Sequence, residues 1–206
     1  MKILVRVFIA IAVLFFLKMC FGIFYIRMTH LSKEDLEWIK PATVYPTAIF
    51  ESNSGRIAKL YIMNHYVNNT TDPFYFSSNS RWDYCANAGY KYIIVQDDVE
   101  IEGYFSISRT FDTDSLEFRT ALNWFHTVDG INSFWKSIPI ERQRFQVGER
   151  IFNNCIKIDS NNASYSEPRT KSTKNKIDLY VMSRKYGLLY YRFENGIEYF
   201  RKFKNV

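Results

Sequence analysis

The sequence contains few of the residues that build cross-linked, metal-bound or nucleotide-binding proteins. Its 206 residues include three cysteines, three histidines, eight glycines and five prolines. Three cysteines are too few for a dense disulfide framework. The chain also lacks the His-Glu-x-x-His, Cys-x-x-Cys, Gly-x-Ser-x-Gly and phosphate-loop patterns, which mark common catalytic and cofactor sites. We therefore predict no catalytic residue, no metal ligand and no cofactor, and expect a protein that is not an enzyme.

Long apolar runs are also scarce: only one stretch of the sequence is long enough to cross a bilayer. Between Arg6 and Arg27 lie twenty residues, of which nineteen are apolar or glycine and Lys18 is the exception. A twenty-residue helix rises about 30 Å, the thickness of the hydrocarbon layer. Inserting the lysine costs about 2.5–3.5 kcal/mol, and each surrounding Leu, Ile, Phe or Val returns about 0.3–0.6 kcal/mol. The sequence therefore predicts one transmembrane helix from Val7 to Ile26.

This apolar run allows three interpretations: a cleaved signal peptide, a lipoprotein signal or an uncleaved signal anchor. A cleaved signal peptide with an apolar core from Val7 to Leu17 needs small residues after the core, and residues 18–21 do not provide them. A lipoprotein signal needs a small residue before Cys20, where Met19 stands. We favour the uncleaved anchor, with the flanking cations placing its amino end inside the cell. Everything after the anchor is then extracytoplasmic.

The net charge of +6 is unevenly distributed along the chain. Residues 28–206 carry 23 bases and 21 acids. The last part of this range, residues 168–206, holds ten of the bases and only three of the acids. The remaining segment, 28–167, holds 13 bases and 18 acids, so we expect no nucleic-acid partner. The basic segment Arg169–Lys176 and the last hairpin are interpreted either as solvated or as contacting anionic lipid headgroups.

A short helix is predicted directly after the anchor. Ser32 is followed three residues later by Asp35, the pattern of a helix cap, and Pro41 is expected to end the helix. We therefore divide the chain into a membrane anchor at 1–27, a stalk helix and linker at 28–45, and a single β domain at 46–206.

The third of these segments has the pattern of strands separated by turns. The predicted strands cover 47–52, 56–67, 90–96, 99–109, 116–128, 149–158 and 177–183, followed by a closing hairpin. In that hairpin a three-residue turn, with Gly196 left-handed, gives better cross-strand pairs than a two-residue turn. The pairs are Phe193–Ile197, Arg192–Glu198 and Tyr191–Tyr199. The fold class is therefore mainly β, an antiparallel meander forming a sandwich or half-barrel.

Two cysteines lie outside the anchor. In an oxidising compartment Cys85 and Cys155 can form one disulfide, worth roughly 4 kcal/mol for a loop of about seventy residues. Two buried thiols account for the same residues equally well.

Aromatic residues form two groups in predicted loops or beside a turn. The first group is Phe74, Tyr75, Phe76 and Trp82, and the second is Trp124, Phe125, Phe134 and Trp135. Because loops lie at the surface, these side chains either cap one end of the sheet or line a ligand groove or partner surface.

Three segments of the chain resemble a group of small bacterial envelope proteins, most of them lipoprotein-like. The segments are LSKEDLEWIKP after the anchor, IFESNSGRIAKLYI, and the closing SRKYGLLYYRFENGIEYFRK. This resemblance covers about a third of the chain and implies a stalk helix, a β domain and an envelope location. It transfers no active residue, and the chain departs from the group in lacking an acylation signal.

Together these features predict a single-pass membrane protein of the bacterial envelope, with its C-terminal β domain outside the cytoplasm. We expect the domain to act by binding or structural association, with membrane lipid contacted through the N-terminal helix and a protein or hydrophobic ligand as partner. The alternative function is a carrier of lipid or another hydrophobic ligand, with an aromatic-lined cavity.

Overall fold

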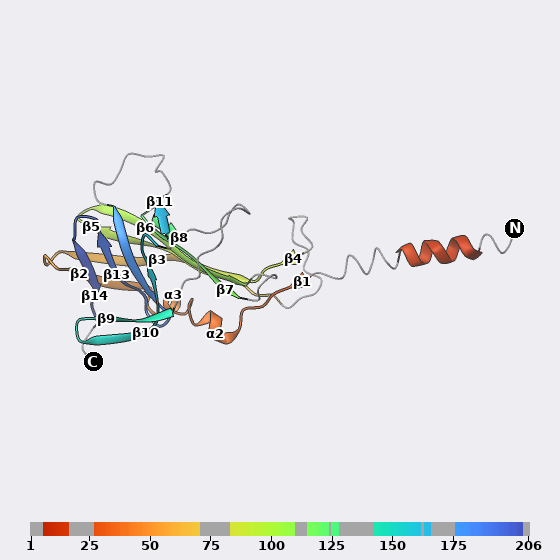
Figure 1. Ribbon diagram of the computed structural model, residues 1–206, viewed down its shortest axis with the longest axis horizontal. Helices are drawn as coiled ribbons and strands as arrows, with labels where there is room; N and C mark the ends of the chain where they lie inside the picture. The colour runs from red at the N-terminus through yellow and green to blue at the C-terminus, as the bar shows by residue number, and fades with distance from the viewer. Residues whose placement is uncertain are drawn as a thin grey trace.

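The chain folds mainly into antiparallel strands, as the computed structural model shows (Figure 1). The structure describes residues 6–16, 27–70, 83–109, 115–123, 125–127, 142–161, 163–165 and 176–203. The early elements are β1 (Arg27–Met28), α2 (Lys33–Leu36), α3 (Pro41–Val44), β2 (Thr47–Ser52), β3 (Ile57–Asn68), β4 (Asp83–Tyr84), β5 (Asn87–Gln96) and β6 (Val99–Arg109). The later ones are β7 (Leu116–Leu122), β8 (Phe125–Thr127), β9 (Arg142–Val147), β10 (Arg150–Ile158), β11 (Ala163–Tyr165), β12 (Ile177–Ser183), β13 (Gly187–Phe193) and β14 (Glu198–Arg201).

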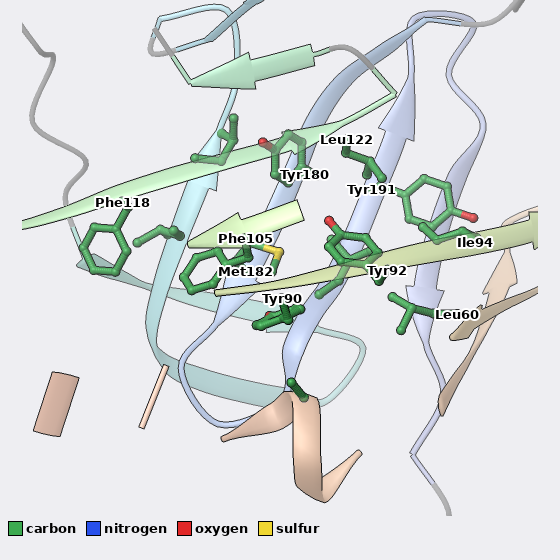
Figure 2. Close-up of a cluster of buried hydrophobic side chains, with 14 of the residues drawn as sticks. Leu60, Tyr90, Tyr92, Ile94, Phe105, Phe118, Leu122, Tyr180, Met182 and Tyr191 are labelled. Atoms are coloured by element: carbon green, nitrogen blue, oxygen red, sulfur yellow. The ribbon is translucent and has the colours of Figure 1, made fainter. Parts of the chain in front are cut away.

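Twelve of the described strands form one sheet, in the order β11-β8-β7-β6-β5-β3-β2-β14-β13-β12-β10-β9. The sheet bends so that its two halves face each other across the main core. The Tyr180 hydroxyl on β12 donates to Thr120 Oγ1 on β7 at 3.4 Å, although six strands separate β12 from β7 in the sheet. Side chains from both halves fill the space between them, among them Tyr92 and Leu122 from one half and Tyr191 from the other (Figure 2).

A second cluster lies on the opposite face of β12 and β13. A bulge in β10 between Phe152 and Cys155 bends the β9–β10 hairpin, and Asn154 within it has a φ of 54°. Phe145 of this hairpin reaches the Tyr190 ring, with centroids 5.4 Å apart. Because both faces of β12 and β13 are covered, these strands are apolar almost without alternation.

The segment 28–45, predicted as a stalk and linker, instead packs into the domain. Leu31, Trp38, Ile39 and Ala42 are all buried in the main core. The Trp38 ring lies 5.9 Å from the Phe105 ring and 4.8 Å from the Phe118 ring. These contacts join residues far apart in the sequence, so the local pattern of a capped helix does not reveal them.

The predicted cap of the first short helix is confirmed. The Asp35 amide donates to Ser32 Oγ at 3.0 Å, and the Ser32 amide donates to Asp35 Oδ2 at 2.8 Å. The role assigned to Pro41 is wrong, because Pro41 begins α3 rather than simply ending a helix. Proline is favoured in the first helical turn, where its missing N–H has no partner to lose.

The closing hairpin has the predicted register. Tyr191 pairs with Tyr199 and Arg192 with Glu198, and Gly196 is left-handed with a φ of 84°. The two tyrosine rings stack with centroids 4.8 Å apart. Comparing the cross-strand pairs of a two-residue and a three-residue turn was therefore sufficient to predict the register of this hairpin.

The long strand predicted over 116–128 is wrong. The chain reverses after Leu122, and Leu122 then pairs with Phe125 in the β7–β8 hairpin. Asn123 has a φ of 50°, a left-handed conformation that asparagine tolerates better than most residues. The turn expected at Asp129-Gly130 lies outside the described residues.

Residues 6–16 form a helix. Within the described part of the chain, no helix combines the length and the apolar character needed to cross a membrane. Of the residues predicted in the span, Val7 lies in this helix, and Leu17, Lys18 and Ile26 lie outside the described residues. The transmembrane helix therefore stays a prediction.

Candidate functional site

The predicted aromatic surface lies mostly outside the described residues. Phe74, Tyr75, Phe76, Trp82, Trp124, Phe134 and Trp135 belong to the part of the chain that the structure does not describe. Phe125 is described, but it is 3% exposed and its ring lies 6.2 Å from that of Tyr180. Phe125 is therefore a core residue and not part of a binding surface.

The structure does not join Cys85 and Cys155 in a disulfide. Cys85 is exposed between β4 and β5, whereas Cys155 is buried on β10 within the second cluster. The Cys155 thiol is directed to the protein backbone, with Sγ 3.6 Å from the carbonyl oxygen of Phe152. The sequence left a disulfide and two thiols as equal alternatives, because sequence separation alone does not show where two cysteines lie relative to each other.

These positions predict very different rates of alkylation for the two cysteines. Burial raises the pKa of the Cys155 thiol to about 11, and only the thiolate reacts rapidly. We expect iodoacetamide at pH 8 to modify Cys85 within minutes and Cys155 at least about 100-fold more slowly. Peptide mass mapping of the folded chain gives both rates. Recovery of a Cys85–Cys155 cross-linked peptide from an unreduced digest would contradict this arrangement.

An open groove of about 690 Å³ lies where the β10 bulge meets the turn between β12 and β13. The end of the α2 segment closes one side through Glu37. We call this feature the cationic groove, because three of its lining side chains are positively charged. Its lining residues are Glu37, Arg150, Ile151, Phe152, Asn153, Asn154, Ser183, Arg184, Lys185 and Tyr186.

Hydrogen bonds hold the turn that carries two of these cations. Arg184 Nη1 lies 2.9 Å from Glu34 Oε1, and Nη2 donates to the Glu34 carbonyl at 2.9 Å. The Arg184 amide also donates to the carbonyl of Asn154 in the bulge, at 3.2 Å. The turn is therefore tied both to the α2 segment and to β10, which fixes the width of the groove.

The aromatic lining residues Phe152 and Tyr186 form the floor of the cationic groove, and the Phe203 ring packs against both. The Tyr186 ring lies 5.7 Å from Phe152 and 5.0 Å from Phe203. Two cations cover this cluster, with Lys185 Nζ 5.0 Å from the Tyr186 ring and the Arg150 guanidinium 5.1 Å from the Phe203 ring. Such distances are typical of cation–π contacts.

The lining of the groove is net positive. Arg150, Arg184 and Lys185 line the groove together with one carboxylate, that of Glu37. Two of these four charges have partners beyond the lining, since Glu37 pairs with Lys40 at 3.3 Å and Arg184 with Glu34 at 2.9 Å. The neighbouring Tyr186 raises the pKa of Lys185 above its ordinary value, so this lysine is charged at neutral pH. Cations beside aromatic rings and amides are suited to bind an anionic ligand that carries a planar or apolar part.

The sequence did not predict this groove. Its residues come from three separate segments, and each segment alone resembles an ordinary turn or strand end. The excess of bases over acids in 168–206 was the one feature of the sequence that pointed toward a cationic site, since Arg184 and Lys185 both belong to that region.

The comparisons with known proteins give no family for this chain. Neither the protein-family models, the curated proteins nor the solved structures show a match to it.

Proposed function

We propose that this protein is a single-pass, membrane-anchored protein of the bacterial envelope. Its exported β domain binds an anionic partner in the cationic groove and does not catalyse a reaction. The observation that supports the binding role is the composition of the groove, in which three cationic side chains and one carboxylate lie over a floor of aromatic rings.

The anchoring role is supported by the helix over residues 6–16. Figure 1 shows this helix apart from the sheet. All of its large apolar side chains are between 50% and 75% exposed, namely Val7, Phe8, Ile9, Ile11, Val13, Leu14, Phe15 and Phe16. Fully burying a side chain of this kind yields about 1.5–3 kcal/mol. A lipid environment for the helix removes that apolar surface from water.

The carrier of a hydrophobic ligand is the weaker alternative. A ligand site for a lipid-sized molecule is an apolar cavity of several hundred Å³. Here the space between the two halves of the sheet is occupied by side chains such as Ile94, Phe105 and Tyr180 (Figure 2). The cationic groove has the necessary volume, but it is open and four of its ten lining side chains are charged.

Binding of a small aromatic anion tests the proposed function. Pyranine, a trisulfonated pyrene, has the charge and the planar shape that the groove favours, and it does not partition into neutral detergent micelles. We expect the full chain in a nonionic detergent to raise the fluorescence anisotropy of pyranine saturably. Lys185→Glu should weaken binding roughly fivefold to thirtyfold, the equivalent of about 1–2 kcal/mol.

Lys59→Glu is the matched control, because Lys59 is an exposed lysine on β3 that does not line the groove. We expect this variant to bind pyranine within about twofold of the wild type. An equal loss in both variants would indicate binding by net charge alone and would contradict a site in the groove.

A further inference from the structure

A buried arginine lies directly behind the floor of the cationic groove. Arg201, at the end of β14, is 7% exposed. Its Nη1 donates to the carbonyl oxygens of Tyr186 and Leu188. The guanidinium also lies 5.4 Å from the Tyr45 ring and 5.8 Å from the Phe203 ring.

No carboxylate among the described residues neutralises this guanidinium. Other arginines of the domain do have acidic partners, since Arg109 pairs with Asp35, Arg184 with Glu34 and Arg192 with Asp178. Burial lowers the pKa of Arg201 to about 10, so the side chain is still charged at neutral pH. A buried charge without a counter-charge is strongly destabilising, which makes an anionic partner favourable.

A second buried polar group points to the same place. The Tyr90 hydroxyl is completely buried and has no hydrogen-bond partner in the part of the chain that the structure describes. A Cβ placed on Gly187 would lie 3.1 Å from this hydroxyl oxygen, which locates the hydroxyl beside the β12–β13 turn. Burial raises the pKa of Tyr90, so the group keeps its proton and is available as a donor.

Arg201 and Tyr90 both line one small cavity of about 10 Å³, together with Tyr45, Tyr186 and Leu188. A cavity this small holds about one small molecule or ion. Phosphate, sulfate and carboxylates are groups of several atoms, so a monatomic anion is the occupant that requires the least space. The small volume therefore favours a monatomic occupant, and the charge of Arg201 favours an anion.

We propose that this cavity is a halide site, in which one chloride ion is held between the Arg201 guanidinium and the Tyr90 hydroxyl. The bound ion neutralises Arg201 and accepts the hydrogen bond that Tyr90 otherwise lacks. It also links β5, β14 and the turn that carries Tyr186, so it stabilises the floor of the cationic groove from behind. The site is independent of the proposed function, because it needs neither a membrane nor a groove ligand.

Thermal unfolding in different sodium salts tests the halide site. With the full chain in detergent at constant ionic strength, replacing gluconate by chloride should raise the unfolding midpoint by about 3–8 °C. Tyr90→Phe removes the hydroxyl and leaves Arg201 in place, and we expect this variant to lose most of that rise. Tyr199→Phe is the matched control, because Tyr199 is a buried tyrosine that does not line the cavity, and it should retain the rise.

Crystals grown in bromide give the direct measurement. We expect an anomalous peak within about 3.5 Å of both the Tyr90 hydroxyl oxygen and a guanidinium nitrogen of Arg201. Equal midpoints in chloride and gluconate, or a cavity that contains only water in the bromide crystals, would overturn the proposal.

Discussion

Replacing Trp38 with alanine should lower the free energy of unfolding by about 3–5 kcal/mol, the cost typical of removing a large buried aromatic side chain. Trp38 is 1% exposed and packs against the rings of Phe105 and Phe118. The substitution removes these contacts and leaves a cavity at the base of the sheet. An effect of this size means that residues 28–45 belong to the folded domain.

Urea unfolding of the full chain, followed by circular dichroism, measures this effect. Val44→Ala is the matched control, because Val44 lies in the same segment but is 49% exposed, and its loss should be below about 1 kcal/mol. If Trp38→Ala also cost less than about 1 kcal/mol, the segment would be an independent stalk, as its sequence alone suggests.

The second large effect is expected at the ion pair between Asp35 and Arg109. Asp35 Oδ2 accepts from Arg109 Nε and from the Ser32 amide, and it lies 2.9 Å from Arg109 Nη2. The two side chains are 7% and 23% exposed. We expect Asp35→Asn to cost about 2–4 kcal/mol at pH 7, because it removes the carboxylate that accepts from a mostly buried arginine.

The same pair predicts how stability depends on acid. Burial alone would raise the pKa of Asp35, but the hydrogen bonds from Arg109 and Ser32 outweigh it, and the pKa is lowered below its ordinary value. The contribution of Asp35 is therefore complete above the unfolded-state pKa of about 3.9 and is lost as the pH falls through the lower folded-state value.

Chemical unfolding at pH values from 7 to 2 checks this dependence. Asp35→Asn should be less stable than the wild type at pH 7, and the difference should shrink below pH 4. Glu37→Gln serves as the control, because Glu37 forms an exposed pair with Lys40 and its loss should change stability by less than about 0.5 kcal/mol. A constant difference between Asp35→Asn and the wild type across this range would show that Asp35 is not ionised in the folded state.

Features that depend on neighbouring residues were predictable from the sequence. The Ser32–Asp35 cap and the turn at Gly196 are both determined by side chains within a few positions. The bounds of β2, β6 and β12 are also those expected from strand-forming residues between turn signals.

Features that depend on contacts across the sheet were not predictable. The burial of Trp38 results from its packing against β6 and β7. The cationic groove similarly requires the β10 bulge at Asn154 to lie beside Arg184. Neither arrangement has a local signature, because each one joins segments that are many residues apart.

The most direct test of the proposed anchored protein is the location of the intact chain in a bacterial cell. We expect full-length protein in the membrane fraction after alkaline carbonate extraction, and protease added from outside should remove the β domain. A double variant, Leu14→Arg with Phe15→Arg, should leave the membrane fraction, because each arginine in an apolar span costs about 2.5–3.5 kcal/mol. Recovery of the wild-type chain as a soluble or shortened form would contradict the anchor and, with it, the proposed envelope function.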